Sequence, residues 1–260
     1  MKTIKIELSK EIKRLEIVPL ADFHVGDPEC KYEEIEKIIQ YIKDNEDTYC
    51  ILNGDLMNTA LKTSVSDVYS EVLTPMEQLL KVRDLLVPIA SKIICVTGGN
   101  HERRIWKTDG IDVTALLAKE LGVLDRYAPN SAVVFIKFGL KKKQHGRKEQ
   151  QMLYTIFCNH GTGNGKRIGG KLNRLEDVAA IVDADVYLHG HSHLPAVFKQ
   201  NFFRTNLTWC SLEQVEKLFV NNNAFLDYGG YGEVFEFAPA SRSVPKIILS
   251  GTERAMKAIL

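Results

Sequence analysis

The sequence changes from a buried strand to a polar loop within the stretch Val96-Thr97-Gly98-Gly99-Asn100-His101-Glu102. The apolar run Ile93–Val96 at its start is too short for a buried helix and is mostly β-branched, which favours a strand. The two glycines let the backbone turn sharply and approach another group closely. We therefore expect Asn100 and His101 to project from the carboxyl edge of a sheet, where open α/β folds bind ligands.

Four other apolar runs also end in residue types that can bind a metal ion. The endings are Asp22-Phe23-His24, Gly54-Asp55, Asn159-His160-Gly161 and Gly190-His191-Ser192-His193. Five of the seven histidines lie in the five endings, whereas His189 adjoins the last one and is interpreted as a hydrogen-bonded strand residue. A single loop Asn or His is usually a turn former or a surface residue, so the shared position of the whole set is what indicates a metal site.

Length and composition indicate one large α/β domain. With 260 residues and 45% hydrophobic content, the chain can bury a substantial core. We assign residues 1–260 to one domain, with a motif-bearing core at 16–200 and C-terminal strands and loops at 201–260. The net charge of +1 provides no overall field for nucleic acid or anionic lipid, so a nucleic-acid contact would have to come from local patches.

The cysteines and the N-terminal segment indicate the cellular environment. The five cysteines are odd in number and form no C-x-x-C pair, which favours reduced thiols. The N-terminal residues alternate between polar and apolar without an apolar signal segment, and no run is long enough to span a bilayer. We expect a soluble cytoplasmic protein that does not bind a membrane.

The first half of the chain predicts two β-α-β units. An edge or hairpin strand is expected at Thr3–Leu8. The two units consist of strand Ile17–Ala21, a helix at 35–42, strand Tyr49–Leu52, a helix that starts at Pro75 after the cap Thr74, and strand Lys92–Thr97. Crossovers of this kind are right-handed, so the three strands should be parallel. A further helix is expected at Ile111–Leu121, where Gly122 ends it.

The second half predicts a change to hairpins. The expected elements are strands Ala132–Phe138 and Leu153–Phe157, a helix over Leu172–Val182, then strands Val186–Leu188, Val197–Phe203, Val234–Phe237 and Ile247–Leu249. Exposed loops are expected at Asn221–Asn223 and Asp227–Gly232. The basic segment Lys141–Lys148 joins two of the strands, and it is either a contact for a phosphate backbone or a solvated hairpin tip.

The candidate ligands predict a two-metal site. They comprise two carboxylates, one amide and four imidazoles: Asp22, His24, Asp55, Asn100, His160, His191 and His193. In Asp-x-His and His-x-His segments with extended backbone, alternate side chains point the same way and can reach one ion. A nitrogen and oxygen set this rich in imidazole favours Mn²⁺, Fe or Zn²⁺ over Mg²⁺ or Ca²⁺.

The ordered pattern Asp22-x-His24, Gly54-Asp55, Gly99–Glu102, His160 and Gly190–His193 resembles the calcineurin-like metallophosphoesterase superfamily. The segment that follows His160 is similar to bacterial and phage-encoded members. The resemblance spans residues 22–193, and it implies a two-sheet β-sandwich flanked by helices (αββα) and hydrolysis of phosphoesters at a dinuclear centre. It further implies that one ion is held by Asp22, His24, Asp55 and His193, and the other by Asp55, Asn100, His160 and His191.

The same resemblance implies a mechanism. Two cations, Mn²⁺ above all, would lower the pKa of a bridging water, so that hydroxide attacks the phosphorus, and would neutralise the phosphate oxygens. His101 binds no ion in this scheme and would protonate the leaving oxygen, unless it only hydrogen-bonds the phosphate. Asn58 would accept a hydrogen bond from His101.

Two positions differ from the protein Ser/Thr phosphatase branch of this superfamily. That branch carries an Asp that orients the acid His and an Arg that clamps the monoester, where this chain has Asn58 and Thr59. Six nearby cations could compensate: Arg103, Arg104, Lys166, Arg167, Lys171 and Arg174. The sequence therefore favours a phosphodiesterase that acts on a nucleic acid or nucleotide. A phosphomonoesterase and a non-catalytic metal-binding scaffold are the alternatives.

Overall fold

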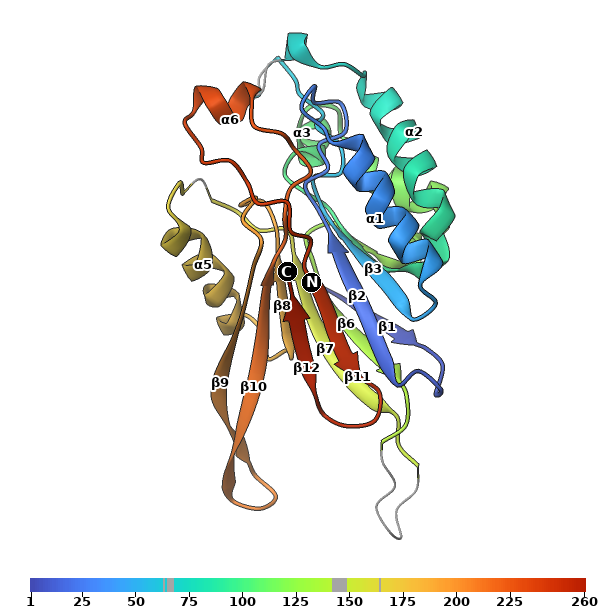
Figure 1. Ribbon diagram of the computed structural model, residues 1–260, viewed down its shortest axis with the longest axis vertical. Helices are drawn as coiled ribbons and strands as arrows, with labels where there is room; N and C mark the ends of the chain where they lie inside the picture. Colours follow the sequence, from blue (N-terminus) through green and yellow to red (C-terminus); the bar gives the residue numbers. More distant parts are fainter. Residues whose placement is uncertain (63, 65–67, 142–148, 164) are drawn as a thin grey trace.

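The computed structural model describes residues 1–62, 64, 68–141, 149–163 and 165–260. Two six-stranded sheets pack face to face with helices on their outer faces, which confirms the predicted αββα sandwich (Figure 1). The predicted basic hairpin tip, residues 142–148, lies outside the described residues. None of the described helices is long and apolar enough to cross a membrane.

The first sheet has the strand order β12-β11-β2-β3-β4-β5. Its strands are β2 (Arg14–Leu20), β3 (Thr48–Asn53), β4 (Ile93–Thr97), β5 (Tyr127–Ala128), β11 (Lys246–Ser250) and β12 (Met256–Ile259). Strands β2 to β5 are parallel, as predicted for the first three of them, and β11 and β12 join antiparallel. The carboxyl ends of β2, β3 and β4 therefore lie at one edge of the sheet.

The second sheet has the strand order β1-β6-β7-β8-β10-β9. Its strands are β1 (Lys2–Glu7), β6 (Ser131–Phe138), β7 (Met152–Asn159), β8 (Val186–His189), β9 (Ala196–Asn206) and β10 (Ser211–Asn221). The strand β1 lies at an edge as predicted, and it is parallel to β6. The strands β7, β8 and β10 are parallel to one another, whereas β9 and β10 form a long antiparallel hairpin.

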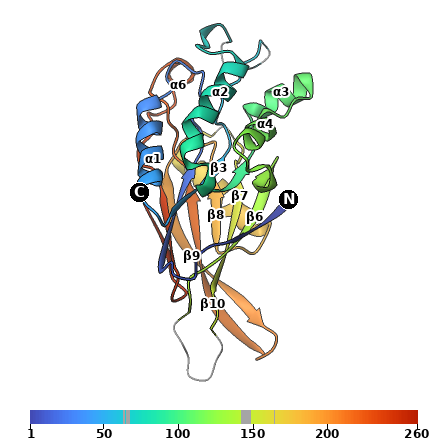
Figure 2. The ribbon, with the colours of Figure 1, turned by 90° about the vertical axis from the view of Figure 1, so that its right-hand side faces the viewer.

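The helices are α1 (Tyr32–Asp44), α2 (Pro75–Leu86), α3 (Glu102–Asp109), α4 (Val113–Glu120), α5 (Ile168–Asp177) and α6 (Gly230–Val234). Thr74 and Glu77 form a reciprocal cap at the start of α2, and the helix ends two residues before Pro88. Figure 2 shows α1 to α4 gathered in the half of the molecule opposite the β9–β10 hairpin. The short helix α3 was not predicted, because only Ile105 and Trp106 among its eight residues are apolar.

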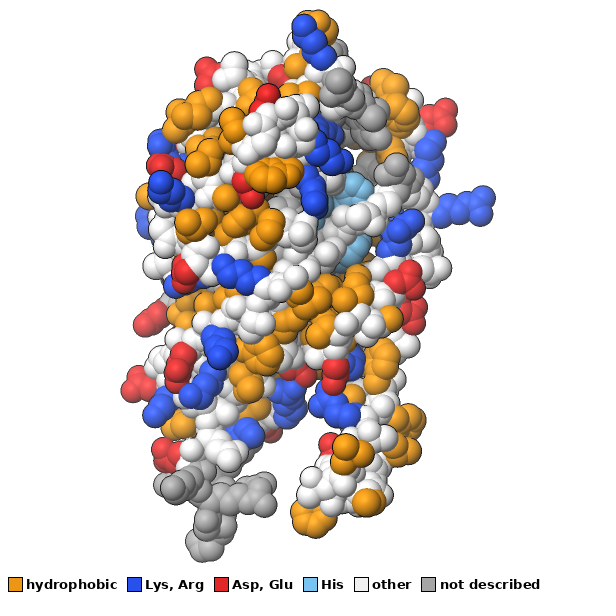
Figure 3. All heavy atoms as spheres, turned by 180° about the vertical axis from the view of Figure 1, so that it is seen from behind, with side chains coloured by type: hydrophobic (Ala, Val, Ile, Leu, Met, Phe, Trp, Pro, Cys, Tyr) orange, Lys and Arg blue, Asp and Glu red, His pale blue; other side chains and the backbone are white. Residues whose placement is uncertain are grey.

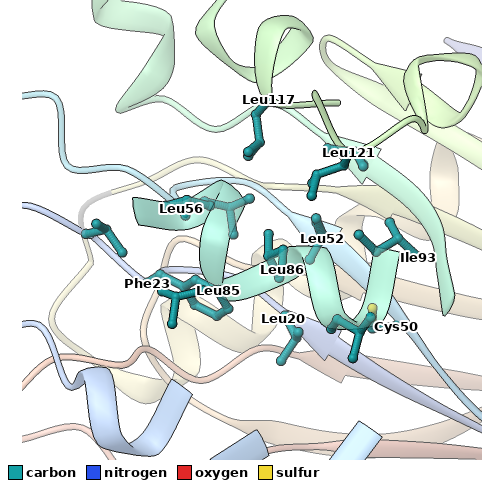
Figure 4. Packing of buried hydrophobic residues seen from close by; sticks show 14 of the residues in the cluster. Leu20, Phe23, Cys50, Leu52, Leu56, Leu85, Leu86, Ile93, Leu117 and Leu121 are labelled. Carbon is teal, nitrogen blue, oxygen red and sulfur yellow. The ribbon is translucent and has the colours of Figure 1, made fainter. Parts of the chain in front are cut away.

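Alternation along the strands divides the core into layers. Ile17 and Ile51 face the other sheet, whereas their neighbours Val18 and Leu52 face the helices. In Figure 4 the side chains of the strands lie against Leu85 and Leu86 of α2. Fully burying one such aliphatic side chain contributes about 1.5–3 kcal/mol, so these layers fix the positions of the strand ends.

Two predictions for the C-terminal region are wrong, and the predicted loop Asp227–Gly232 ends early, because α6 begins at Gly230. Val234–Phe237 is not a strand: α6 ends at Val234, and the next amides bond locally, from Glu236 to Glu233 and from Phe237 to Gly232. Short apolar runs do not distinguish helix or turn from strand. The loop Asn221–Asn223 is buried rather than exposed, because Asn221 ends β10 inside the molecule and the Asn222 amide donates to the carbonyl of His189.

Candidate metal centre

The five predicted strand endings meet at one edge of the sandwich. Loops of the first sheet bond to each other, since the amides of Asp22 and His24 donate to the carbonyls of Gly54 and Asp55, both at 3.0 Å. Contacts between the sheets follow the same pattern, because the His191 amide donates to Asp22 Oδ2 at 3.2 Å. The predicted ligands from both sheets are therefore brought together.

Three overlapping groups of side chains have donor atoms within 4.8 Å of one another, among the residues that the structure describes. They are Asp22, His24 and His193; His24, Asp55 and His101; and Asp55, His160 and His191. The middle group shares one residue with each of the others, so the three form one continuous centre. Asn100 joins it, because its Oδ1 lies 3.2 Å from His160 Nε2.

The histidine rings are held with one nitrogen facing the centre. The Nδ1 atom of His24 lies 3.2 Å from Asn58 Oδ1, and that of His160 lies 2.7 Å from the carbonyl oxygen of Asn53. Both partners are acceptors, so each Nδ1 carries a proton, and Nε2 is the nitrogen left to bind a metal ion. The Nε2 atoms of His24 and His193 lie only 3.2 Å apart, an arrangement that a cation between them would stabilise.

The two carboxylates lack ordinary hydrogen bonds at the atoms that face the centre. Asp22 Oδ1 and Asp55 Oδ2 are buried and accept no hydrogen bond, although His193 Nε2 and His160 Nε2 approach them at 3.2 and 2.9 Å. A buried carboxylate oxygen without a donor is costly unless a cation faces it. Together with the imidazole lone pairs, these oxygens form a donor set that fits divalent metal ions.

The pKa shifts of these residues also indicate that the centre favours positive charge. Burial raises the pKa of Asp22 and Asp55, but the facing imidazoles outweigh it and hold both values well below the ordinary range. Burial lowers the pKa of His160, whereas the charge of Asp55 outweighs it and raises that pKa to about 10. Without metal, protons on the imidazoles provide the charge that ions would otherwise supply.

The backbone around the centre is strained. Of the eight non-glycine residues with positive φ in the described part of the chain, six lie in these loops: Asp22, His24, Asp55, Thr59, His191 and His193. Each such residue costs on the order of 1–3 kcal/mol unless its surroundings enforce it. Gly99 allows the close approach, because a Cβ there would lie 2.1 Å from Asp55 Oδ1. Strain and burial thus concentrate at the predicted ligands.

Glu102 supports the loops of the centre, a role that the sequence analysis did not assign to it. Its buried carboxylate accepts hydrogen bonds from the amides of Asp55, Met57 and Gly99, at 3.0 to 3.1 Å. Burial and the charge of Asp55 raise the pKa of Glu102 to about 7. The only sequence signal was its place directly after His101, at the start of α3.

His101 is the one histidine of these groups that is not a predicted ligand, and 14% of its side chain is exposed. Its Nε2 is 3.8 Å from Asp55 Oδ2, and its Nδ1 is 2.9 Å from the backbone oxygen of Asn58. The expected contact with Asn58 thus exists, but through the main chain, because the Asn58 side chain is held by His24, Asp27 and Glu71. Burial lowers the pKa of His101 well below its ordinary value, although Asp55 opposes this.

Arg104 and Lys171 contact residues of the centre. Arg104 Nη2 lies 3.1 Å from His101 Nε2, and Lys171 donates to the carbonyl of Ser192, which lies between two predicted ligands, at 2.7 Å. Arg103 instead donates to Asn130, and Lys166 pairs with Glu236. His189 is hydrogen-bonded to Asn221, as expected for a packed strand residue. Figure 3 shows histidine side chains in a hollow with Lys and Arg side chains near it.

The sequence profile of the calcineurin-like phosphoesterase family matches residues 16–195, more than half of the chain. No curated protein sequence matches the chain.

Solved structures with overall similarity include a conserved protein described as a predicted phosphoesterase from Streptococcus pneumoniae TIGR4, at 15% identity and a TM-score of 0.37, covering 95% of this chain and 98% of that one. A metallophosphoesterase from Sphaerobacter thermophilus is 13% identical with a TM-score of 0.38, covering 91% and 84%. Vps29 from Entamoeba histolytica in complex with Zn²⁺ is 12% identical with a TM-score of 0.36, covering 94% and 97%.

Proposed function

The chain belongs to the calcineurin-like phosphoesterase family and is a metal-dependent phosphoesterase, and we propose that its substrate is a phosphodiester in a nucleic acid or a nucleotide. The observation that carries this proposal is the continuous centre of carboxylates and imidazoles at the edge of both sheets. We assign one ion to Asp22, His24, Asp55 and His193, and the other to Asp55, Asn100, His160 and His191. We assign Asp55 as the bridge, because it is the only carboxylate that belongs to two of the three groups.

The metal ions would supply two things when bound: neutralisation of the phosphate oxygens and activation of a water molecule as the nucleophile. We propose Mn²⁺ as the ion, with Fe or Zn²⁺ as alternatives. Hydrolysis then forms one bond from the water oxygen to phosphorus and breaks the bond to the leaving oxygen, which needs a proton. The chain has to place that proton at the leaving oxygen.

His101 is our candidate for this proton transfer. The carbonyl of Asn58 accepts from Nδ1 and thereby turns Nε2 toward the centre. The same carbonyl would stabilise the imidazolium that forms when Nε2 takes up a proton. Asn58 therefore contributes through its backbone to His101 and through its side chain to the ligand His24.

The preference for a diester rests on Thr59. Its side chain is buried and donates to the backbone oxygen of His101 at 2.6 Å, so this position supplies no cation for the second negative charge of a monoester. A phosphomonoesterase is the second candidate, because Arg104 and Lys171 lie beside the centre. A non-catalytic scaffold that has lost its metal ligands does not fit this chain, because every position where a ligand is expected carries a residue type that can bind a metal ion.

Hydrolysis of bis(4-nitrophenyl) phosphate and 4-nitrophenyl phosphate by protein loaded with Mn²⁺ tests the proposal. We expect a higher kcat/KM for the diester. A preference for the monoester would identify a phosphatase, and hydrolysis of neither would contradict the proposal.

Replacing His101 tests its role separately from metal binding. His101→Ala should retain both ions, and kcat should fall by about 10² to 10⁴ on a diester with a poor leaving group. The loss should be much smaller on a nitrophenyl ester, whose leaving group departs as an anion. Equal losses on both substrates, at verified metal content, would show that His101 binds phosphate or supports the structure instead.

A further inference from the structure

Helix α3 begins directly after His101 and carries an unusual set of side chains: Arg103, Arg104, Trp106 and Lys107. Glu102 and Ile105 are buried and hold the helix against the body of the protein. Trp106 is 53% exposed, although an indole of this size is usually buried. Asp109 is the one acid of α3 that is exposed, so the accessible charge of this helix is positive.

Arg104 places a cation on the leaving-group side of the centre. Its Nη2 lies 3.1 Å from His101 Nε2, and its Nη1 donates to the carbonyl of Asn58 at 3.1 Å. Because His101 Nε2 is the atom proposed to protonate the leaving oxygen, the guanidinium lies next to the leaving group. When an internal linkage of a nucleic acid is cleaved, the leaving group carries the next phosphate, which a guanidinium binds well.

Another face of α3 borders a cavity of about 300 Å³. Arg103 and Trp106 line it together with Gly98 and Asn130. Thr114, which also lines it, is buried, and its Oγ1 has no hydrogen-bond partner. An exposed indole beside polar groups in a cavity of this size is a surface on which a nucleobase can stack.

We propose that α3 binds the leaving strand of a single-stranded nucleic acid, with Arg104 and Lys107 on successive phosphates and Trp106 stacked on a base in the cavity. This rests on the proposed phosphodiesterase function and specifies its substrate class. A paired duplex keeps its bases stacked inside, so it offers none to Trp106, whereas single strands bind through cations along the backbone and aromatic side chains. The net charge of +1 does not oppose the proposal, because the cations are local.

Fluorescence gives a direct test, because the chain has only two tryptophans, Trp106 on α3 and Trp209 at the tip of the β9–β10 hairpin. The probe is a single-stranded oligothymidylate with phosphorothioate linkages, added to protein loaded with Mn²⁺. In the Trp209→Phe variant, the remaining Trp106 should be quenched on binding. In the matched Trp106→Phe variant, Trp209 should not respond. Quenching of Trp209 alone would overturn the proposal.

Affinity and its salt dependence test the cations and the stacking. Trp106→Ala should weaken binding by about 5- to 150-fold, whereas Trp209→Ala should not change it. Lys107→Gln should reduce the slope of log K against log salt by about 0.7, whereas Lys37→Gln on α1 should leave the slope unchanged. Two results together would contradict the proposal: the same salt slope in Lys107→Gln as in Lys37→Gln, and an unchanged affinity of Trp106→Ala for the oligonucleotide. They would mean that nucleic acid binds elsewhere on the protein or does not bind.

Hydrolysis of bis(4-nitrophenyl) phosphate separates this proposal from the function on which it rests. If wild type cleaves this small diester but neither binds nor cleaves the single strand, the substrate class is wrong and the phosphodiesterase remains. If it cleaves no diester at all, the proposed function fails whatever the binding result. Arg104→Gln should reduce the cleavage of an oligothymidylate with ordinary phosphodiester linkages. Arg104→Lys should reduce it less, because lysine keeps the positive charge but lacks the planar guanidinium group.

Discussion

The carboxyl edge of the sheets and the far end of the β9–β10 hairpin differ in almost every physical respect. At the edge, His24 and Asp55 are buried polar residues with left-handed backbone, and they are held by contacts from several strands. At the hairpin, eleven pairs form a regular antiparallel ladder, and Leu207 and Trp209 at the tip are 87% and 78% exposed. The strand β10 connects the two regions (Figure 2).

This comparison shows which part of the fold can maintain strained backbone and buried charged groups. Strained backbone and desolvated carboxylates persist only where neighbouring segments over-determine them. At the edge, bonds from Asp55, Met57 and Gly99 to Glu102 provide that support, whereas the described hairpin tip has only local bonds such as those to Asn206. Substitutions at the edge should therefore alter chemistry and stability, and those at the tip should alter little.

The largest effect is expected for Asp55→Ala. Only a bridging carboxylate serves both ions, so this variant should lose both and fall to background activity, whereas His193→Ala should weaken one site more than the other. Metal analysis of purified protein, together with turnover of the nitrophenyl diester, measures this. Two tightly bound ions per chain in Asp55→Ala would show that the bridge is assigned wrongly.

Glu102→Ala should have the next largest effect, on stability. It leaves three buried amide donors without an acceptor, and each such group costs about 1–3 kcal/mol, so a loss of about 3 kcal/mol or more is expected. Urea unfolding of the metal-free protein measures the change. The control is Glu213→Ala on the exposed part of β10, which should change stability by less than about 0.5 kcal/mol. Similar losses in both variants would remove the distinction between the two regions.

The sequence predicted the edge well for a physical reason. Asp22, His24 and Asp55 follow short apolar strands directly, and parallel strands in one sheet bring their carboxyl ends together. Their positions therefore follow from periodicity and topology alone. The shared position of His160 and His193 after apolar runs also placed them in this site, whereas the second sheet that carries them was implied only by the family resemblance.

What the sequence left open depends on contacts between distant segments. The Asn58 side chain turns to His24 rather than His101, because Asp27 and Glu71 both accept from its amide. The loop at Asn222 has the composition of an exposed turn, yet its backbone pairs with His189 and is buried. Nothing in the local sequence specifies these partners.

Asn58→Asp should have an intermediate and pH-dependent effect. It places a third carboxylate beside Asp27 and Glu71, and we expect a loss of about 2 kcal/mol at neutral pH. Burial already raises the pKa of Glu71 above its ordinary 4.5 in the folded state, so folding is favoured at low pH, and this contribution disappears as the pH rises through the folded pKa. The added charge should raise that pKa further.

The defect of Asn58→Asp should therefore grow from pH 4.5 toward pH 8, as measured by urea unfolding of the metal-free protein. Asn58→Ala is the matched control, because it loses the same two hydrogen bonds to Asp27 and Glu71 without adding charge, and its defect should vary much less with pH. If the loss of stability depended on pH in the same way in both variants, repulsion between the carboxylates at positions 27, 58 and 71 would not be its cause.

The smallest effects should come from glycine at two strained residues, one in each region. Thr59 and Cys210 have φ of 44° and 45°, where glycine relieves about 1–2 kcal/mol of strain. Cys210 is exposed at the hairpin tip, so Cys210→Gly should stabilise the protein by about 1 kcal/mol and leave kcat unchanged. Thr59→Gly also removes a buried side chain whose hydroxyl donates to the carbonyl of His101, and the lost hydrogen bond, about 0.5–1.5 kcal/mol, together with the lost packing offsets the relief. Its stability should therefore change little while kcat falls several-fold. Urea unfolding and diester turnover measure both variants, and equal stabilisation with unchanged kcat would mean that the strain at Thr59 does not serve to position His101.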